Sequence, residues 1–171
     1  MFLKIYTELA VDFERVREAM QGRPRVWLDG LAEYVDQQGQ RMLVEVGLDV
    51  GGHPIRRSAW VEIGQAISAD RVASLPLWLE VQDHQGLFPS FAGNLDAAWL
   101  GDRRTHLSLS AWYDPPFGFL GTMADRALMH RVAEAVAHHF LERVAERLSA
   151  RSVAGVDFRI GENHPSVAGL R

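Results

Sequence analysis

The chain has 171 residues, no cysteine and a formal net charge of −4. This length suits one domain with a full-sized core, so we expect a single domain over residues 1–171. The lack of cysteine excludes disulfides, thiolate zinc sites and cysteine nucleophiles, and the scattered basic residues argue against nucleic-acid binding.

Targeting and cofactor signals are missing from the sequence. Residues 1–6 lack the charged segment and apolar run of a signal peptide, and no apolar stretch approaches the roughly eighteen residues that span a bilayer. We therefore expect a cytoplasmic protein without a membrane span. Gly-x-Gly-x-x-Gly, Walker and Gly-x-Ser-x-Gly motifs do not occur, so the sequence predicts no nucleotide chemistry, no serine-hydrolase chemistry and no cofactor.

The first part of the chain predicts a strand followed by two helices. Residues 2–11 alternate loosely and are rich in β-forming residues, and a polar helical segment follows at 12–20. Gly22-Arg23-Pro24 ends that helix. Residues 25–38 carry apolar side chains at three-and-four spacing, which predicts a second short helix.

From Arg41 onward the apolar period changes to two, which is typical of antiparallel strands. Gly51-Gly52 predicts a hairpin turn, Pro76 predicts an edge strand or a bulge, and Gly93 predicts a bend. With the first strand, this gives six strands, or seven if a short one is missed. The later five are expected at residues 41–49, 55–67, 75–81, 91–100 and 105–113.

The alternation also predicts which side of the sheet is covered. One face is apolar on every strand, so a helix is expected to cover it, while the other face is wet. Trp60, Trp78 and Trp112 fall opposite the apolar faces, which places them on the outer side as a candidate partner surface. A register slip of one residue would invert this assignment.

A long helix is predicted after the last strand. Pro115-Pro116 cannot continue a central strand, and Thr122 with Asp125 fits a capping box that opens a helix over residues 123–150. Such a helix is about 42 Å long. Its apolar ridge has a spacing of four residues and rotates by ~280° along its length, so a flat sheet cannot bury all of it.

Three explanations of that rotation stay open. A strongly curved sheet wraps the helix, or the alanines make the ridge look more regular than it is. Alternatively, the first half packs inward and the second half meets the amino-terminal helices or another subunit. Contact with another subunit would give a homodimer through the long helix. The side chains concerned in the second half are Ala137, Phe140, Leu141, Val144 and Leu148. Residues 152–171 have no period and predict an extended or mobile tail.

The order of these elements is that of the helix-grip fold, and three segments carry a closer resemblance. Residues 87–89, 107–118 and 125–134 resemble a bacterial branch of the START-like superfamily, also called SRPBCC or polyketide cyclase-like. The resemblance covers roughly residues 86–148. It implies an α+β helix-grip fold, in which a curved antiparallel sheet of about six or seven strands wraps around a long C-terminal helix, with two short helices after the first strand.

The resemblance implies a cavity between sheet and helix that holds a hydrophobic or amphipathic small molecule, such as a lipid, a sterol-like compound or a polyketide. Members of the superfamily include transfer proteins, receptors and some cyclases, so the fold does not settle the function. We expect binding without catalysis. The expected cavity walls are Val44, Val46, Val61, Leu77, Leu79, Leu95, Leu107, Leu109 and Tyr113 on the strands, and Met123, Ala127, Leu128 and Arg131 on the helix.

Two residues leave other functions open. The Tyr113 hydroxyl either points into the cavity or bonds backbone near Pro115. Arg131 either enters the cavity, where it would receive a ligand carboxylate or phosphate, or pairs with Glu134 at the surface. Together they would suit a polyketide cyclase, dehydratase or isomerase that polarises a carbonyl. A third interpretation is a protein-interaction module with a filled core.

A metal site on the long helix is not expected. His130, Glu134 and His138 stand four residues apart, but the rise from the first to the third is ~12 Å, which is too long for one ion to reach both histidines. Solvated helix positions explain this spacing better.

Overall fold

The computed structural model of the chain describes residues 1–22, 32–35, 41–50, 53–82, 89–114 and 123–157. Eight strands and two helices lie in these ranges. They are β1 (Phe2–Leu9), α1 (Phe13–Gln21), β2 (Ala32–Val35), β3 (Arg41–Val50), β4 (His53–Ile63), β5 (Ile67–Ser68), β6 (Val72–Val81), β7 (Ser90–Gly101), β8 (Arg104–Asp114) and α3 (Met123–Asp157).

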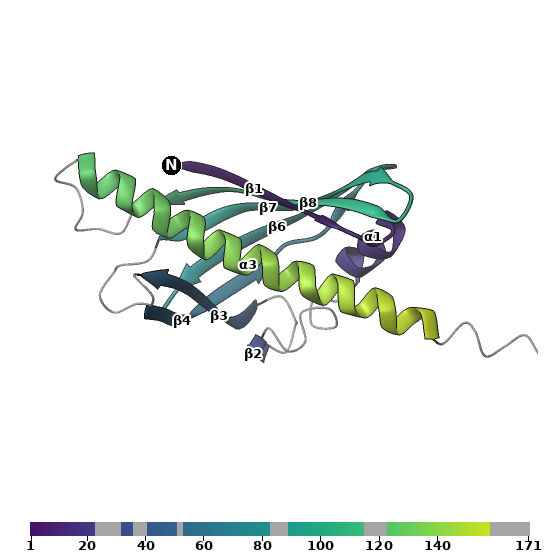
Figure 1. Cartoon of the computed structure of the whole chain (residues 1–171), viewed down its shortest axis with the longest axis horizontal. Coiled ribbons are helices and arrows are strands. Elements are labelled where there is room, and N and C mark those ends of the chain that lie inside the picture. The colour runs from purple at the N-terminus through teal and green to yellow at the C-terminus, as the bar shows by residue number, and fades with distance from the viewer. Residues whose placement is uncertain (23–31, 36–40, 51–52, 83–88, 115–122, 158–171) are drawn as a thin grey trace, which may run out of the picture.

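The strands form one open antiparallel sheet in the order β1-β8-β7-β6-β4-β3-β2, and the short β5 pairs with β6 off this path. Figure 1 shows α3 running diagonally across one face of the sheet, with α1 at the end of the same face. This is the α+β helix-grip architecture, so the predicted fold class is confirmed.

The predicted second helix is wrong for residues 32–35. They form strand β2, in which Val35 pairs with Met42 of β3. Tyr34 and Val35 have aromatic and β-branched side chains that favour a strand, and pairing with β3 outweighs their helical spacing. The rest of the predicted helix, at 25–31 and 36–38, lies outside the described residues, as does the Gly51-Gly52 turn.

The long helix continues past its predicted end. It begins at Met123 as expected and reaches Asp157, so the extended tail predicted over residues 152–171 is wrong for 152–157. Residues 158–171 lie outside the described part of the chain. Gly155 is the residue of this last segment that weakens a helix most, and a single glycine costs a helix about 1 kcal/mol, which an established helix can absorb.

One stripe of α3 packs on its own sheet. The stripe follows three-and-four spacing, and its side chains are at most 5% exposed: Ala133, Val136, Ala137, Phe140, Leu141, Val144 and Leu148. Their partners lie on β1, β3, β8 and α1. The second half of α3 therefore packs inward. Its own chain covers these side chains, so they offer no surface to another subunit, and the expected homodimer stays a prediction.

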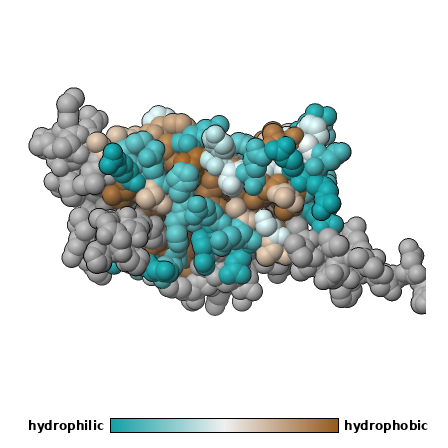
Figure 2. Space-filling model, in the orientation of Figure 1, coloured by the Kyte–Doolittle hydropathy of each residue, from teal (hydrophilic) through white to brown (hydrophobic). Residues whose placement is uncertain are grey.

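The exposed side of α3 is polar. In Figure 2, which views the molecule from the α3 side, hydrophilic residues cover much of the described surface, and apolar residues are visible between them. The helix thus has one buried apolar face and one solvated polar face, as expected for an amphipathic helix on a sheet.

The two faces of the sheet differ as the alternation predicts. The inner face, under α3, is apolar and buried, and Trp60, Trp78 and Trp112 lie on the outer face. Trp78 is 50% exposed and Trp112 is 65% exposed, while Trp60 is half-buried. The predicted register is therefore correct.

The sequence predicts an edge or a bulge at Pro76, but β6 lies inside the sheet between β4 and β7. The position tolerates proline because β6 changes partner there, from β4 to β5. The carbonyl of Pro76 accepts a hydrogen bond from the backbone N–H of Gly64 at 2.8 Å. The nitrogen of Pro76 faces the same side, where β4 has ended, so the missing N–H removes no hydrogen bond to β7.

Gly93 of β7 marks a close approach of two backbones rather than a bend. It pairs with Ala111 of β8, and a Cβ atom added at Gly93 would lie 2.0 Å from the carbonyl oxygen of Ser110. No side chain fits in that space, so β7 and β8 require glycine at this position.

We expect Gly93→Ala to destabilise the protein by about 3 kcal/mol or more, because β7 and β8 must move apart to admit the methyl group. Urea unfolding measures this change. The matched control is Asn94→Ala, next to it on the exposed face, which should change the free energy of unfolding by less than about 0.5 kcal/mol. Equal effects of the two substitutions would contradict the close approach.

Candidate functional site

The predicted strand residues of the site lie together on the inner face of the sheet. All are at most 4% exposed: Val44, Val46, Val61, Leu77, Leu79, Leu95, Leu107, Leu109 and Tyr113. Cross-strand pairs connect them, for example Val61 with Leu79 and Leu95 with Leu109. They form a continuous apolar surface that faces α3, although their contact with a ligand stays a prediction.

The predicted helix residues of the site do not all reach this surface. Ala127 and Arg131 are exposed on α3, and their contact with a ligand stays a prediction. Among the helix residues whose burial is described, the buried stripe runs from Ala133 to Leu148, and these two residues lie outside it. Met123 begins α3, but its side chain and that of Leu128 lie outside the described residues.

A chain of polar side chains lies at one end of the inner face. The hydroxyl of Tyr113, at the end of β8, is 2.8 Å from Nδ1 of His130 on α3, and the two rings stack at 6.0 Å between centroids. Nε2 of His130 is 3.3 Å from a carboxylate oxygen of Glu134. Tyr113 is buried, whereas His130 and Glu134 have side chains that are 40% and 47% exposed. The chain therefore runs from the interior to the solvent.

The hydrogens on Tyr113 and His130 can be arranged in two ways that fit these contacts. A neutral His130 that donates its Nε2–H to Glu134 accepts the Tyr113 O–H at Nδ1. A protonated His130 donates at both nitrogens, and the Tyr113 O–H then turns to the Sδ of Met1, 3.3 Å away. Both arrangements satisfy the hydrogen-bonding groups of Tyr113, His130 and Glu134.

His130 was missed as a site residue because the sequence does not give its distance from Tyr113. Its spacing resembles a metal pattern along one helix, whereas its contact is with the strand. Among the described residues, Glu134 pairs with His130 and not with Arg131, which decides against the predicted Arg131–Glu134 pair. The predicted backbone partner of Tyr113 near Pro115 lies outside the described residues.

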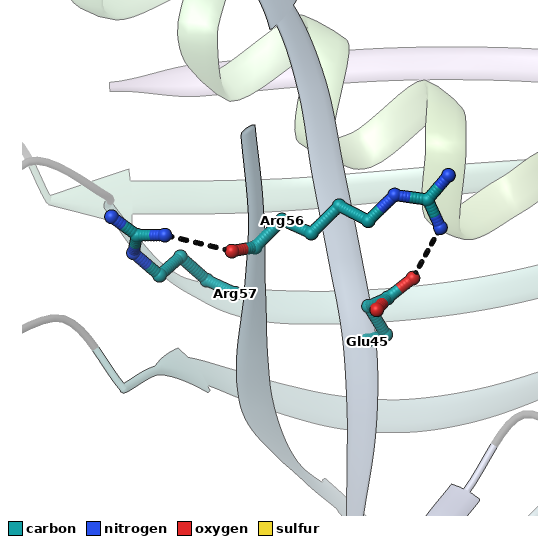
Figure 3. A network of polar contacts seen from close by, with 3 residues as sticks. All are labelled: Glu45, Arg56 and Arg57. Atoms are coloured by element: carbon teal, nitrogen blue, oxygen red, sulfur yellow. Dashed lines mark hydrogen bonds and ion pairs between the residues drawn. The ribbon is translucent and has the colours of Figure 1, made fainter. Parts of the chain in front are cut away.

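Arg57 is a second residue that the sequence analysis missed. It shares the inner strand face with Ala59 and Val61, pairs with Val46 and is half-buried. Its Nη1 donates to the carbonyl of Arg56 at 2.8 Å. Arg56 itself is held by Glu45 at 2.6 Å on the outer side, and Figure 3 shows the two arginines extending in opposite directions. The alternation of β4 was the available signal for Arg57.

In the described part of the chain, no group of three or more His, Cys, Asp or Glu side chains lies close enough to hold a metal ion. His138 is exposed on α3 and takes no part in the contacts of His130. The arrangement suits proton transfer and hydrogen bonding rather than coordination.

Comparison with known proteins identifies the fold. No protein-family model matches the sequence, and no curated protein matches it. Several solved structures do match. A conserved protein from Geobacillus kaustophilus has a TM-score of 0.57 at 14% identity, over 88% of this chain and 96% of that one. The Zhui aromatase/cyclase from Streptomyces sp. R1128 has a TM-score of 0.52 at 16% identity, over 88% and 94%.

A protein from Thermus thermophilus is similar as well, with a TM-score of 0.50 at 14% identity over 89% of this chain and 99% of that one. The chain thus has the START-like helix-grip fold over most of its length, and the resemblance predicted from the sequence is confirmed for the fold. Identities this low carry no activity over to the chain.

Among the described residues, no helix is both long and apolar enough to cross a membrane. The expected cytoplasmic location stays a prediction.

We expect Tyr113→Phe to lower the free energy of unfolding by about 1 kcal/mol, because the substitution removes the hydroxyl bonded to His130 and keeps the ring. Chemical denaturation measures the loss. Tyr6→Phe is the matched control, since Tyr6 is 67% exposed on β1. It should be neutral within about 0.5 kcal/mol, and a neutral Tyr113→Phe would show that the bond adds no stability.

Proposed function

We propose that this protein binds a hydrophobic or amphipathic small molecule between the inner face of its sheet and α3, without catalysing a reaction. The observation that carries the proposal is the continuous apolar inner face, with its smallest side chains in the middle. Gly93 pairs with Ala111 there, between Leu77 on β6 and Leu3 on β1. A ligand with an apolar body would pack against the large side chains of this face.

The polar groups of the site support an amphipathic ligand. Tyr113 and Arg57 lie toward the same end of the sheet, since Tyr113 aligns with Leu79 near the end of β6 and Arg57 lies further along β4 in that direction. A ligand with an apolar body on the inner face would place its polar group at this end. Donors such as a phenol and a guanidinium favour a carbonyl or carboxylate there.

The proposal is tested with protein purified from its own host. Native mass spectrometry should show a retained small molecule, and the fluorescent amphiphile 1-anilinonaphthalene-8-sulfonate should compete with it. Ala111→Phe places a bulky ring in the middle of the inner face and should weaken binding of this probe at least tenfold. Ser110→Phe places the same ring on the opposite face of β8 and should leave binding unchanged.

Urea unfolding of both variants confirms that each one is folded. The proposal fails if no molecule is retained and the probe binds equally to both variants, because the inner face would then be filled by the protein itself.

A second candidate function is a polyketide cyclase-type reaction, which the Tyr113–His130–Glu134 chain favours. In an intramolecular aldol closure a base removes an α-proton, the enolate carbon bonds to a carbonyl carbon, and the resulting alkoxide takes a proton. When the Tyr113 hydroxyl turns to Met1, Nδ1 of His130 is suited to take the α-proton. Tyr113 would then protonate the alkoxide and regain a proton from Nδ1 across their 2.8 Å contact. Arg131, the other predicted participant, is exposed and has no part in this scheme.

The two candidates differ in what Tyr113→Phe does. In the binding protein this variant still retains its ligand, whereas in the cyclase it abolishes cyclisation of a poly-1,3-diketone, followed by mass spectrometry of the product. No product from the unmodified protein would exclude the second candidate for this substrate.

A further inference from the structure

The outer face of the sheet, opposite α3, carries a pocket of about 360 Å³ that the proposed function does not use. It spans five strands and combines aromatic, acidic and small residues. The lining residues are Arg41, Trp60, Glu62, Trp78, Leu79, Glu80, Ser90, Phe91, Ala92, Trp112 and Asp114. Three of the five tryptophans of the chain meet there.

The strand register explains the shape of the pocket. Trp78 of β6 pairs with Ala92 of β7, and Ala92 pairs with Trp112 of β8. The two tryptophans are thus two strand spacings apart, or roughly 10 Å between Cα atoms, with only a methyl group between them. Trp60 lies diagonally from Trp78 on the neighbouring strand, because Trp60 pairs with Glu80 and Glu62 pairs with Trp78. Indole rings therefore wall a slot whose floor is alanine.

The charges around the slot are mainly negative. Glu62, Glu80 and Asp114 contribute three carboxylates to the lining, and all three residues are exposed on the outer face. Arg41 is the one cationic residue in the lining described, and its guanidinium carbon lies 4.7 Å from the centroid of the Trp60 ring. The three carboxylates thus outnumber the one cationic side chain, and the Trp60 ring already contacts the guanidinium of Arg41.

We propose that this slot binds a small organic cation of the alkylammonium class, with a quaternary ammonium as the best fit. Indole faces attract cations through their quadrupole, and carboxylates around them add Coulomb attraction. A quaternary ammonium also buries its methyl groups between the rings, which a metal ion does not. The chemistry is opposite to that of the inner face, where the proposed ligand is apolar, so this site does not depend on the proposed function.

The test uses choline and its neutral carbon isostere, 3,3-dimethylbutan-1-ol, which have nearly the same shape. Indole N–H resonances of the full chain are followed by NMR during each titration. Choline should shift the resonances of Trp60, Trp78 and Trp112 in a saturable way, and the isostere should bind at least tenfold more weakly.

Variants assign the binding to the slot. Trp78→Ala and Trp112→Ala should each weaken choline binding at least fivefold, and both side chains are at least half exposed, so folding should be retained. Glu80→Gln keeps the shape and should weaken choline without affecting the isostere. Trp99→Ala is the matched control, because Trp99 is 43% exposed and stacks under Arg71 at 4.6 Å but lies outside the pocket.

Three results would overturn the inference. Choline and the isostere binding equally would remove the role of charge. Trp99→Ala weakening choline as much as Trp78→Ala would move the site elsewhere. A choline titration to about 50 mM, well beyond a millimolar dissociation constant, without saturable shifts at the three indoles would exclude this class of ligand.

Discussion

The packing of one helical stripe on one sheet face is the constraint from which the rest of the structure follows. The stripe from Ala133 to Leu148 is buried on β1, β3 and β8, and it fixes which side of the sheet is interior. Once that side is fixed, the two-residue period of each strand assigns every other side chain to the inside or to the outside. The apolar inner face and the outward-facing tryptophans therefore both follow from the packing of the buried stripe of α3 on the sheet.

Much of the fold could be predicted because periodicity is local. Strands β3, β4, β6, β7 and β8 follow from alternation, and the start of α3 follows from Pro115-Pro116 and the capping box. What failed depended on partners that are distant in sequence. Val35 joined a strand because β3 was available to pair with it, and the inward half of α3 could not be chosen without knowing where the helix crosses the sheet.

The candidate site shows the same division. Its strand residues, such as Val61 and Leu109, were found because alternation places them correctly. Arg131 is exposed, whereas the sequence placed it on the cavity wall, because a rotating apolar ridge leaves the inward direction open over half a turn. His130 was recognised only as a pattern along the helix, since its contact with Tyr113 depends on the path of the intervening chain. Long-range contacts of polar residues are thus the part of a site that a sequence reveals least.

The Gly93–Ala111 pair also has a consequence for how the protein reaches its fold. At this point the two backbones leave no room for any Cβ atom, so only glycine can stand opposite Ser110 and Ala111. If the β7–β8 hairpin formed two residues out of step, Phe91 or Leu95 would meet that carbonyl and the strands could not close. The close contact therefore favours the register in which Gly93 stands opposite Ala111.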